Sequence, residues 1–540
     1  MVDGVVEIRG GRVRGVERGG IWSFSGVPFA ASTAGGARWR PPAPPEPWAG
    51  VRDCSAFGPA APQSQGAMEQ ALGGSPEATS EDCLNLNVWT PGLDGGRRPV
   101  MVWVHGGSFM TGSGSSGLYR GGLLAREGDV VVVTVNYRLG LLGFLAHPAL
   151  AESGSTWLDG SPWSGSGNWG LADQVAALAW VRDHIADFGG DPHRVTLFGE
   201  SAGGMSVSTL LAAPEAAGLF HRAIVESGPA YTCSADVAAD RAERLAAHLD
   251  VPCTREALTA VPAERLVEAA ATFVDVAGGT DAGLLMTPVV DGGLLSAPPL
   301  DAVAAGSAAG VPLLLGTTRD ESAFFALGNP ALQSLDDEGL RRWTRRLTPD
   351  GTAADEVIAA VRGARSGRGE PVAPLDLWSA IATESVFRVG TTRLADAHAA
   401  AAGPGVGTFA YLFTWASPAF GGVLGSCHAL EIPFVFGTLR NPLVQAFSGG
   451  GDDAMALSAA MRQSWVSFAR DGVPAYDVPG VGAVAWGRWE PSRRPTTVLG
   501  PWPGADGPVH PVDGPRRAEL DAVGAVVAAG FGHRESLPRG

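Results

Sequence analysis

A serine flanked by glycines is the residue of this sequence best suited to covalent chemistry. The sequence Gly-Glu-Ser-Ala-Gly at residues 199–203 follows a short apolar run at 195–198 and precedes a stretch with helical spacing. A G-x-S-x-G pattern between a strand and a helix is typical of the sharp turn that exposes a nucleophilic serine. The amide of Ala202, at the start of the helix, can donate to a developing oxyanion. We therefore expect Ser201 to attack a substrate carbonyl.

A second glycine-rich loop could complete an oxyanion hole. His105, Gly106 and Gly107 follow an apolar run of strand length at residues 100–104. Glycines let backbone amides approach a substrate carbonyl closely, and loops of the H-G-G-G type supply such amides. We expect Gly106 and Gly107 to donate together with Ala202. His105 is expected to support this loop rather than to act as the catalytic base.

The same region contains a pattern of another functional class. Residues 112–117 read Gly-Ser-Gly-Ser-Ser-Gly, which matches G-x-G-x-x-G. A dinucleotide site needs this pattern directly after a strand, with an acidic residue further on. Here residues 105–111 intervene, and Asn136 stands where the acidic residue would be. We therefore predict a flexible loop at the rim of the site and no nucleotide cofactor.

The carboxylate partner of such a serine follows it along the chain. Asp320 and Glu321 come shortly after an apolar run at residues 313–315. Both carboxylates follow a strand, so either could reach a histidine at the end of the sheet. The pattern alone does not separate Asp320 from Glu321.

The histidines that follow these carboxylates and could serve as the base are His398, His428, His510 and His533. His398 lies near the end of a helical stretch, where the helix dipole favours a cation. His510 lies in a proline-rich tail, and His533 is close to the C-terminus. His428 lies in a glycine-rich loop after the apolar run at residues 409–413. Because a loop at the end of a strand can reach the serine, we predict that His428 is the base.

These residues need a scaffold of strands whose carboxyl ends meet. Apolar runs of strand length lie at residues 84–89, 100–104, 130–135, 195–198, 223–225, 313–315 and 409–413. Helical spacing is found at residues 171–188, from 202 onward, and at 241–249, 391–401 and 455–470. This alternation predicts an α/β fold with a mostly parallel central sheet and helices on both faces. No internal repeat or long linker divides the chain, so we expect one domain over residues 1–540.

Composition narrows the possible partners and locations. The net charge of −16 argues against a nucleic-acid partner, which would require a basic surface. The most apolar stretch, residues 130–151, contains Asn136 and Arg138, so we expect no membrane span. The N-terminus lacks the pattern of a secretory signal, and the five cysteines favour a reducing, cytoplasmic location. No spacing of His, Cys and Glu typical of zinc is present, so we expect no metal.

Several longer segments resemble type-B carboxylesterases, the family that includes bacterial para-nitrobenzyl esterases and cholinesterases. Examples are S-E-D-C-L-N-L-N-V-W at residues 80–89 and N-W-G-L-A-D-Q at 168–174, with further matches at 24–30, 136–140, 188–192 and 425–437. The resemblance implies an α/β-hydrolase fold whose helical and loop insertions form an active-site gorge. It also implies a bacterial-type esterase for a small-molecule ester, without a cofactor, as a monomer or small homo-oligomer.

The resemblance also assigns roles around the serine. In the family the acid is the glutamate of a D-E pair, which corresponds to Glu321. Glu200 and Ser227 resemble residues that lie close to the triad; alternatively, they only make hydrogen bonds in the core. Four apolar residues could line an acyl pocket or could equally be core, namely Phe324, Phe325, Val386 and Phe387.

The chain departs from the family at its cysteines and at one tryptophan. Cys83 matches a family half-cystine whose partner is replaced by Ala61, and the expected partner of Cys253 is absent. Both departures favour free thiols. Cholinesterases bind the choline ammonium through a tryptophan before the E-D-C segment. No tryptophan occurs between Trp48 and Trp89, which argues against a choline ester.

The same triad permits other reactions. Hydrolysis of thioesters, amides or carbamates, and acyl transfer or cyclisation, would use the same groups. A non-catalytic scaffold on the same fold is a further alternative, which the presence of Ser201, Glu321 and His428 disfavours. The sequence thus predicts a serine carboxylesterase and leaves its ester open.

Overall fold

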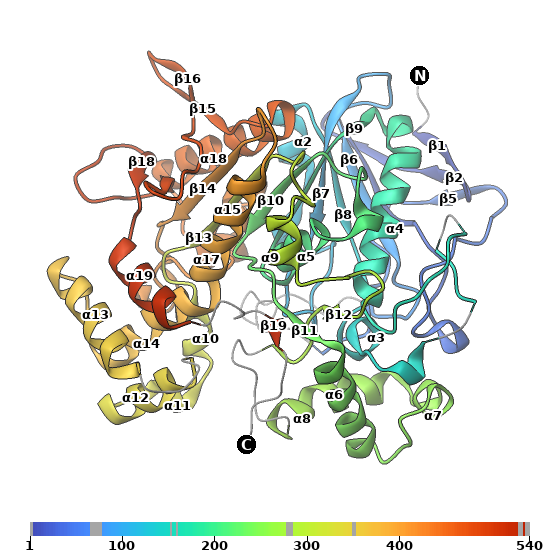
Figure 1. Ribbon diagram of the computed structural model, residues 1–540. Helices are drawn as coiled ribbons and strands as arrows, with labels where there is room; N and C mark the ends of the chain where they lie inside the picture. Colours follow the sequence, from blue (N-terminus) through green and yellow to red (C-terminus); the bar gives the residue numbers. More distant parts are fainter. Residues whose placement is uncertain are drawn as a thin grey trace.

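A large twisted sheet crosses the molecule (Figure 1). The computed structural model describes residues 4–64, 78–151, 154–157, 160–276, 284–347, 353–527 and 533–534. Within them, eleven strands pair in the order β18-β17-β14-β13-β10-β9-β7-β8-β6-β4-β3. The strands from β17 to β8 pair in parallel, and both edges of the sheet are antiparallel.

The parallel strands are β7 (Arg98–Val104), β8 (Val131–Val135), β9 (Gly190–Glu200), β10 (Arg222–Glu226), β13 (Leu313–Thr318), β14 (Thr408–Phe413) and β17 (Pro495–Leu499). Most of their residues are buried on both faces, which explains why their sequences are near-continuous apolar runs. The antiparallel edges are formed by β3 (Val16–Arg18), β4 (Ile21–Pro28), β6 (Asn85–Thr90) and β18 (Val509–Asp513). The predicted α/β architecture is confirmed.

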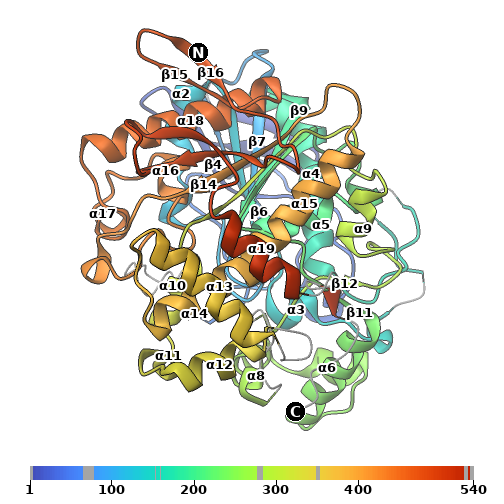
Figure 2. The ribbon, with the colours of Figure 1, turned by 60° about the vertical axis from the view of Figure 1, so that its left-hand side comes forward.

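Helices cover both faces of the sheet, and successive strand residues point to opposite sides. In β7, Val102 and Val104 join the core under α4 (Trp169–His184) and α5 (Ala202–Leu210). Met101 and Trp103 join the other core, under α2 (Gly122–Gly128) and α18 (Asp452–Asp471). Figure 2 shows the sheet between these layers, with α15 (Val389–Ala401) crossing it obliquely.

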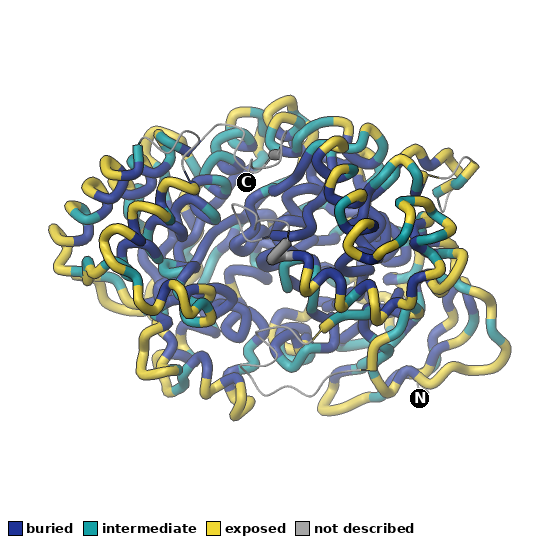
Figure 3. Tube along the Cα trace, turned by 90° about the horizontal axis from the view of Figure 1, so that it is seen from below, coloured by how far each residue is buried: buried dark blue, intermediate teal, exposed yellow. Residues whose placement is uncertain are grey.

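Two groups of helices are inserted between the strands. The first comprises α6 (Ala235–His248), α7 (Arg255–Ala260) and α8 (Ala263–Val276), before β13. The second comprises α10 (Ser322–Leu327), α11 (Pro330–Gln333), α12 (Asp337–Arg345), α13 (Ala354–Gly367) and α14 (Pro374–Thr383), between β13 and β14. Figure 1 shows the two groups below the sheet on opposite sides. Viewed from below, exposed residues gather on these helices and buried chain lies between them (Figure 3).

Smaller elements complete the described structure. A three-stranded sheet joins β1 (Val5–Ile8), β2 (Gly11–Arg14) and β5 (Val51–Asp53). A second one joins β11 (Thr232–Ser234), β12 (Val289–Val290) and β19 (His533–Arg534), and a hairpin is formed by β15 (Ala475–Val478) and β16 (Gly482–Ala485). Among the described helices, none combines the length and apolar character that crossing a bilayer requires.

Candidate active site

Ser201 lies in a strained turn between β9 and α5. Its φ of 56° is unusual for a residue other than glycine, and its amide donates to the carbonyl of Glu226 at the end of β10, at 2.9 Å. A Cβ on Gly203 would come within 2.0 Å of the carbonyl oxygen of Val104, so only glycine fits there. The turn therefore packs tightly on β7 and fixes the backbone that carries the Ser201 hydroxyl.

His428 and Glu321 form a buried pair beside this turn. His428 Nδ1 lies 2.6 Å from Glu321 Oε2, and the two residues are 4% and 0% exposed. The other carboxylate oxygen, Oε1, accepts from Ser227 Oγ at 2.6 Å and from the amide of Thr318 at 2.7 Å. Because an ionised carboxylate only accepts, Nδ1 must carry the proton of this imidazole. Nε2 is then the basic nitrogen.

Asp320 points away from this pair, although it is adjacent to Glu321. Asp320 Oδ2 accepts from the amide of Ser426 and from Arg319, both at 2.9 Å, and the amide of Asp320 donates to the carbonyl of Ser426. It thus anchors the loop that leads to His428. Of the two carboxylates between which the pattern does not choose, Glu321 is the one that contacts His428.

The free nitrogen of His428 faces Glu200. Glu200 Oε1 lies 3.1 Å from Nε2, and neither atom has a hydrogen-bond partner in the described part of the chain. No hydrogen bond joins Nε2 to Ser201 Oγ among the described residues. Catalytic hydrogen bonds are often long or misaligned without substrate and tighten only when it binds.

Of the other candidate histidines, His398 has two local partners of its own. His398 contacts Thr408 Oγ1 at 2.7 Å and the carbonyl of Val311 at 2.9 Å. His510 is buried in β18 at the far edge of the sheet, and His533 is described only as part of the backbone of β19. Among the described side chains of these candidates, that of His428 is the one that pairs with Glu321.

The loop after β7 passes directly over the nucleophile. A Cβ on Gly106 would lie 2.8 Å from the carbonyl oxygen of Glu200 and 2.9 Å from Ser201 Cβ. The amides of Gly106, Gly107 and Ala202 donate to no described residue, which leaves them available to a substrate oxygen. The three expected donors thus belong to two segments that are in contact.

His105 supports this loop from below. Its ring stacks on Tyr137 with centroids 4.5 Å apart, and Nδ1 lies 2.8 Å from the carbonyl of Gly106. Burial lowers the pKa of His105 from 6.5 to about 4, so the ring is neutral at neutral pH. This arrangement agrees with a structural role.

The prediction of a flexible rim loop at residues 112–117 is wrong. Ser113 and Ser115 are buried, and their hydroxyls lie 2.6 Å apart. The amide of Gly114 donates to the side chain of Asn136, and Thr134 Oγ1 donates to the carbonyl of Gly114. Buried polar groups need partners, and the small Gly and Ser residues here form an internal network instead of a surface loop.

A cluster of buried carboxylates lies behind the triad, at Glu200, Glu226, Glu321 and Glu431. Ser227 Oγ reaches Glu431 Oε1 at 3.5 Å as well as Glu321, and Trp465 Nε1 donates to Glu226 at 2.8 Å. Burial, reinforced by the neighbouring carboxylates, raises the pKa of Glu200 and Glu431 well above the usual range. Burial also raises the pKa of Glu226 from 4.5 to about 8. Glu226 is therefore largely protonated at neutral pH.

Glu226 and Glu431 were not singled out in the sequence. Each carboxylate follows or interrupts an apolar run, Ala223-Ile224-Val225 in one case and Leu430 to Phe434 in the other. A carboxylate within such a run is the signal that could have identified both, because an acidic residue is rarely buried without a special environment.

Glu226→Gln is expected to change how stability depends on pH. The native state keeps the Glu226 proton between pH 4.5 and about 8, whereas the unfolded chain releases it near pH 4.5. The native state thus binds more protons in this window, so the free energy of unfolding falls as pH rises through it. Urea unfolding across this window should show a smaller fall for Glu226→Gln than for the wild type. Glu46→Gln, at an exposed position, is the control, and an equal fall in wild type and Glu226→Gln would contradict the assignment.

The four candidate pocket residues separate into two pairs. Phe387 and Phe325 lie beside His428, with ring centroids 4.8 and 5.1 Å from the imidazole, and their own rings stack at 6.1 Å. Phe325 is 46% exposed, so it can meet a substrate. Phe324 packs against the core under α18, and the carbonyl of Val386 accepts from the Tyr231 hydroxyl.

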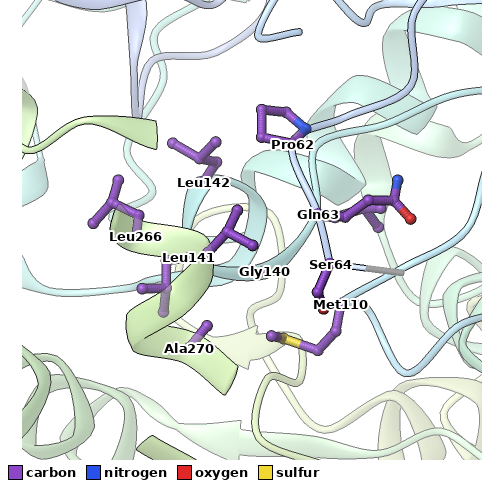
Figure 4. Close-up of a pocket in the computed structure, with 11 residues that line it drawn as sticks. Pro62, Gln63, Ser64, Met110, Gly140, Leu141, Leu142, Leu266 and Ala270 are labelled. Carbon is purple, nitrogen blue, oxygen red and sulfur yellow. The ribbon is translucent and has the colours of Figure 1, made fainter. Parts of the chain in front are cut away.

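An apolar pocket that was not expected opens near the oxyanion loop (Figure 4). Met110, three residues after Gly107, lines it on one side, together with Gln63. Leu141 and Leu142 of α3 (Gly140–Phe144) and Leu266 and Ala270 of α8 line it on the other. Gln63 also binds the amide and the carbonyl of Gly112, so the wall of the pocket is tied to the loop. Within the described residues, no group of three or more His, Cys, Asp or Glu is arranged to hold a metal.

Comparison with known proteins places this geometry in context. A model of the carboxylesterase family matches residues 2–501. The para-nitrobenzyl esterase of Bacillus subtilis (strain 168) is 36% identical over 508 residues, covering 92% of this chain and 95% of that protein. The phenmedipham hydrolase of Pseudarthrobacter oxydans is 36% identical over 486 residues, covering 86% and 90%. The crystal structure of a Geobacillus stearothermophilus carboxylesterase matches with a TM-score of 0.80 and 38% identity, covering 96% of this chain and 99% of that one.

Proposed function

The chain belongs to the carboxylesterase family and is a serine carboxylesterase, and on this premise we propose that Ser201, His428 and Glu321 carry out its ester hydrolysis. One observation carries the assignment of residues. His428 is held by Glu321 through Nδ1, while its basic Nε2 stays unpartnered beside the turn that presents Ser201. A base with its proton-accepting nitrogen free next to a strained serine is arranged for nucleophilic catalysis.

The reaction would proceed in two halves. Ser201 Oγ attacks the ester carbonyl as its proton passes to His428 Nε2, and the amides of Gly106, Gly107 and Ala202 bind the oxyanion. Nε2–H then protonates the leaving alcohol, which leaves an acyl group on Ser201. Water attacks this acyl-enzyme, its proton passes to Nε2, and the carboxylic acid leaves as Oγ takes the proton back. Glu321 stays ionised and accepts from Nδ1–H throughout.

Glu200 and Ser227 would support this cycle. Glu200 Oε1, 3.1 Å from Nε2, would stabilise the imidazolium that forms in each half-reaction. Ser227 Oγ, which donates to Glu321, would hold the carboxylate in the plane that Nδ1 needs. These roles go beyond hydrogen bonding in the core, because both side chains touch a member of the proposed triad.

We further propose that the preferred substrate is an uncharged ester with an aromatic or apolar alcohol group. The leaving oxygen must lie near His428 Nε2, where the stacked rings of Phe325 and Phe387 form one wall. The acidic side chains of Glu200 and Glu321 flank His428, so these contacts offer an anionic group no cationic partner. An uncharged aromatic group would instead gain contact with the rings.

A matched panel of substrates tests this proposal. Phenyl butyrate should be turned over faster than butyranilide and phenyl thiobutyrate, and faster than an ester that carries a carboxylate on its alcohol. Phe325→Ala should raise KM for phenyl butyrate relative to ethyl butyrate by about 3- to 10-fold, the usual worth of an aromatic contact. Phe420→Ala is the control, because Phe420 is exposed and is not one of the described rings in contact with His428. A dominant rate on the amide would contradict an ester substrate.

We also propose a reducing, cytoplasmic environment. All five cysteines are described and unpaired, and four of them are buried. Free thiols in such numbers support a compartment in which disulfides do not form. Thiol titration of the native and the unfolded protein, purified without reductant, would test this point.

A further inference from the structure

A π-helical turn, Glu384–Arg388, joins α14 to α15 beside the proposed triad. Turns of this kind insert one extra residue into a helix and are frequent at functional sites. Phe387 and Arg388 are consecutive residues of this turn, and they reach different targets. Phe387 contacts the imidazole of His428, and Arg388 reaches the end of β13, which leads to Glu321.

We propose that Arg388 is a positioning residue for ester hydrolysis, because its guanidinium holds the end of β13 in the geometry that brings Glu321 to His428. The inference rests on the proposed triad. It assigns to Arg388 no contact with substrate, and its effect passes through Glu321.

The contacts of Arg388 use all three guanidinium nitrogens. Nη2 donates to the carbonyls of Thr318 and Arg319 at 2.8 and 3.1 Å, and Nε donates to Thr317 Oγ1 at 3.1 Å. Nη1 pairs with Glu384, one turn earlier on the same helix. Arg388 is only 7% exposed, so these bonds lie in a region of low dielectric, where they are strong.

The held segment is the one that orients Glu321. The amide of Thr318 donates to Glu321 Oε1 at 2.7 Å. Arg388 binds the hydroxyl of Thr317, the residue before this amide, and the carbonyl of Thr318 itself. Loss of these contacts would let the end of β13 shift and carry the Thr318 amide away from Oε1. Glu321 would then lose one of the two donors that set its plane toward His428.

A lysine cannot replace this arrangement. Its single ammonium could pair with Glu384, but it lacks the planar fork that reaches two carbonyls and a hydroxyl at once. Arg388→Lys therefore keeps the buried charge but loses the simultaneous hydrogen bonds to the end of β13. A matched control is Arg393→Lys on the same helix, because Arg393 also donates through Nη2 to two carbonyls, those of Gly524 and Val527, away from β13.

The kinetic test compares these two variants on p-nitrophenyl butyrate. Arg388→Lys should lower kcat per active site roughly 10- to 100-fold, since a misplacement of about 1 Å in a catalytic group has effects of this size. KM should change little, because no substrate contact is removed, and Arg393→Lys should keep kcat near the wild-type value. Active sites are counted by labelling with a fluorophosphonate. An unchanged kcat per labelled site, with only a lower melting temperature, would overturn the proposal.

Chemical rescue gives a second readout that a purely structural role would not move. A cavity lined by Arg388, Thr317, Thr391 and Trp489 borders the guanidinium. Millimolar guanidinium should therefore restore part of the kcat of Arg388→Ala, whereas urea, of similar shape and no charge, should not. Equal effects of guanidinium and urea would contradict the proposal. If Arg388→Ala does not fold, Thr317→Val decides, because it removes only one acceptor and should lower kcat by a smaller factor in the same direction.

Failure of this inference can be told apart from failure of the triad. If the triad were wrong, the fluorophosphonate would not label Ser201 in the wild type. If only the role of Arg388 were wrong, Ser201 would be labelled in the wild type and in Arg388→Lys, and both would turn over substrate at the same rate.

Discussion

Replacing Ser201 by alanine is expected to abolish nearly all esterase activity, with a fall in kcat on the order of 10⁵- to 10⁶-fold. The hydroxyl is the only group that the change removes, and without it no acyl-enzyme can form. The remaining rate would come from binding and from the oxyanion amides, which act without the serine. The turn should survive, because alanine carries the same Cβ in the same backbone conformation.

Initial rates on p-nitrophenyl butyrate and a thermal melt measure the two parts of this expectation. Ser464→Ala is the control, because Ser464 is also a buried serine, within α18, and its hydroxyl donates to the carbonyl of Ala460. That variant should keep its activity within a few-fold. Mass spectrometry after fluorophosphonate treatment should show one adduct, on the peptide that contains Ser201, and none in Ser201→Ala. A variant that retained substantial esterase activity would refute the assignment of the nucleophile.

The proposed nucleophile could be predicted from the sequence because its signal is local. The strand, the turn and the helix around Ser201 are consecutive, and each has a recognisable pattern. The same holds for the strands of the central sheet, which are buried on both faces and therefore form continuous apolar runs. Features that depend on consecutive residues were the ones that sequence reasoning recovered.

Contacts between distant segments were not recoverable in this way. Glu321 and His428 are 107 residues apart, and Ser227 is 94 residues from Glu321. Their meeting depends on the pairing of β10, β13 and β14, which sets the strand ends side by side. The order of strands in a sheet does not follow from the runs themselves, so the support that Glu321 receives was accessible only through family resemblance.

Adjacent residues with opposite roles were a second difficulty. Asp320 and Glu321 have the same chemistry, and Phe324 and Phe325 are identical. Neighbouring residues at the start of a helix point in directions about 100° apart, so one meets the site and the other meets the framework. The orientation of α10 decides which of two neighbouring side chains faces the site, and this orientation is set by packing.

The buried carboxylates explain why Glu321 needs hydrogen-bond donors besides His428. A carboxylate in a low-dielectric region favours its neutral form, and its neighbours in the cluster strengthen this preference. Glu321 must nevertheless stay ionised to orient His428. Two hydrogen bonds, from Ser227 Oγ and the amide of Thr318, favour the charged form at Oε1. These two donors orient Glu321 beside Glu226 and Glu431, whose neutral forms are favoured by burial.

Glu321→Gln is expected to lower kcat by about 10⁴-fold, because it fixes the wrong tautomer of the base. The two donors at Oε1 require an acceptor, so the amide oxygen of glutamine must take that position. Its NH2 group then faces His428 Nδ1, 2.6 Å away in the wild type, where two donors cannot meet. Nδ1 must lose its proton and accept, which places the proton on Nε2. An imidazole protonated at Nε2 cannot take the proton of Ser201.

The neighbouring carboxylate provides the matched control for this result. Asp320→Asn changes the same kind of group one residue earlier, and the acceptor at Oδ2 can still be supplied to the Ser426 amide by an amide oxygen. We therefore expect kcat of Asp320→Asn to stay within about tenfold of the wild type, against the roughly 10⁴-fold fall for Glu321→Gln. Thermal melts of both variants would separate catalysis from folding, since the replacement of one acceptor by an isosteric amide preserves shape. Equal losses in the two variants would mean that the loop before α10 acts as a unit, and a larger loss in Asp320→Asn would transfer the role of the acid to Asp320.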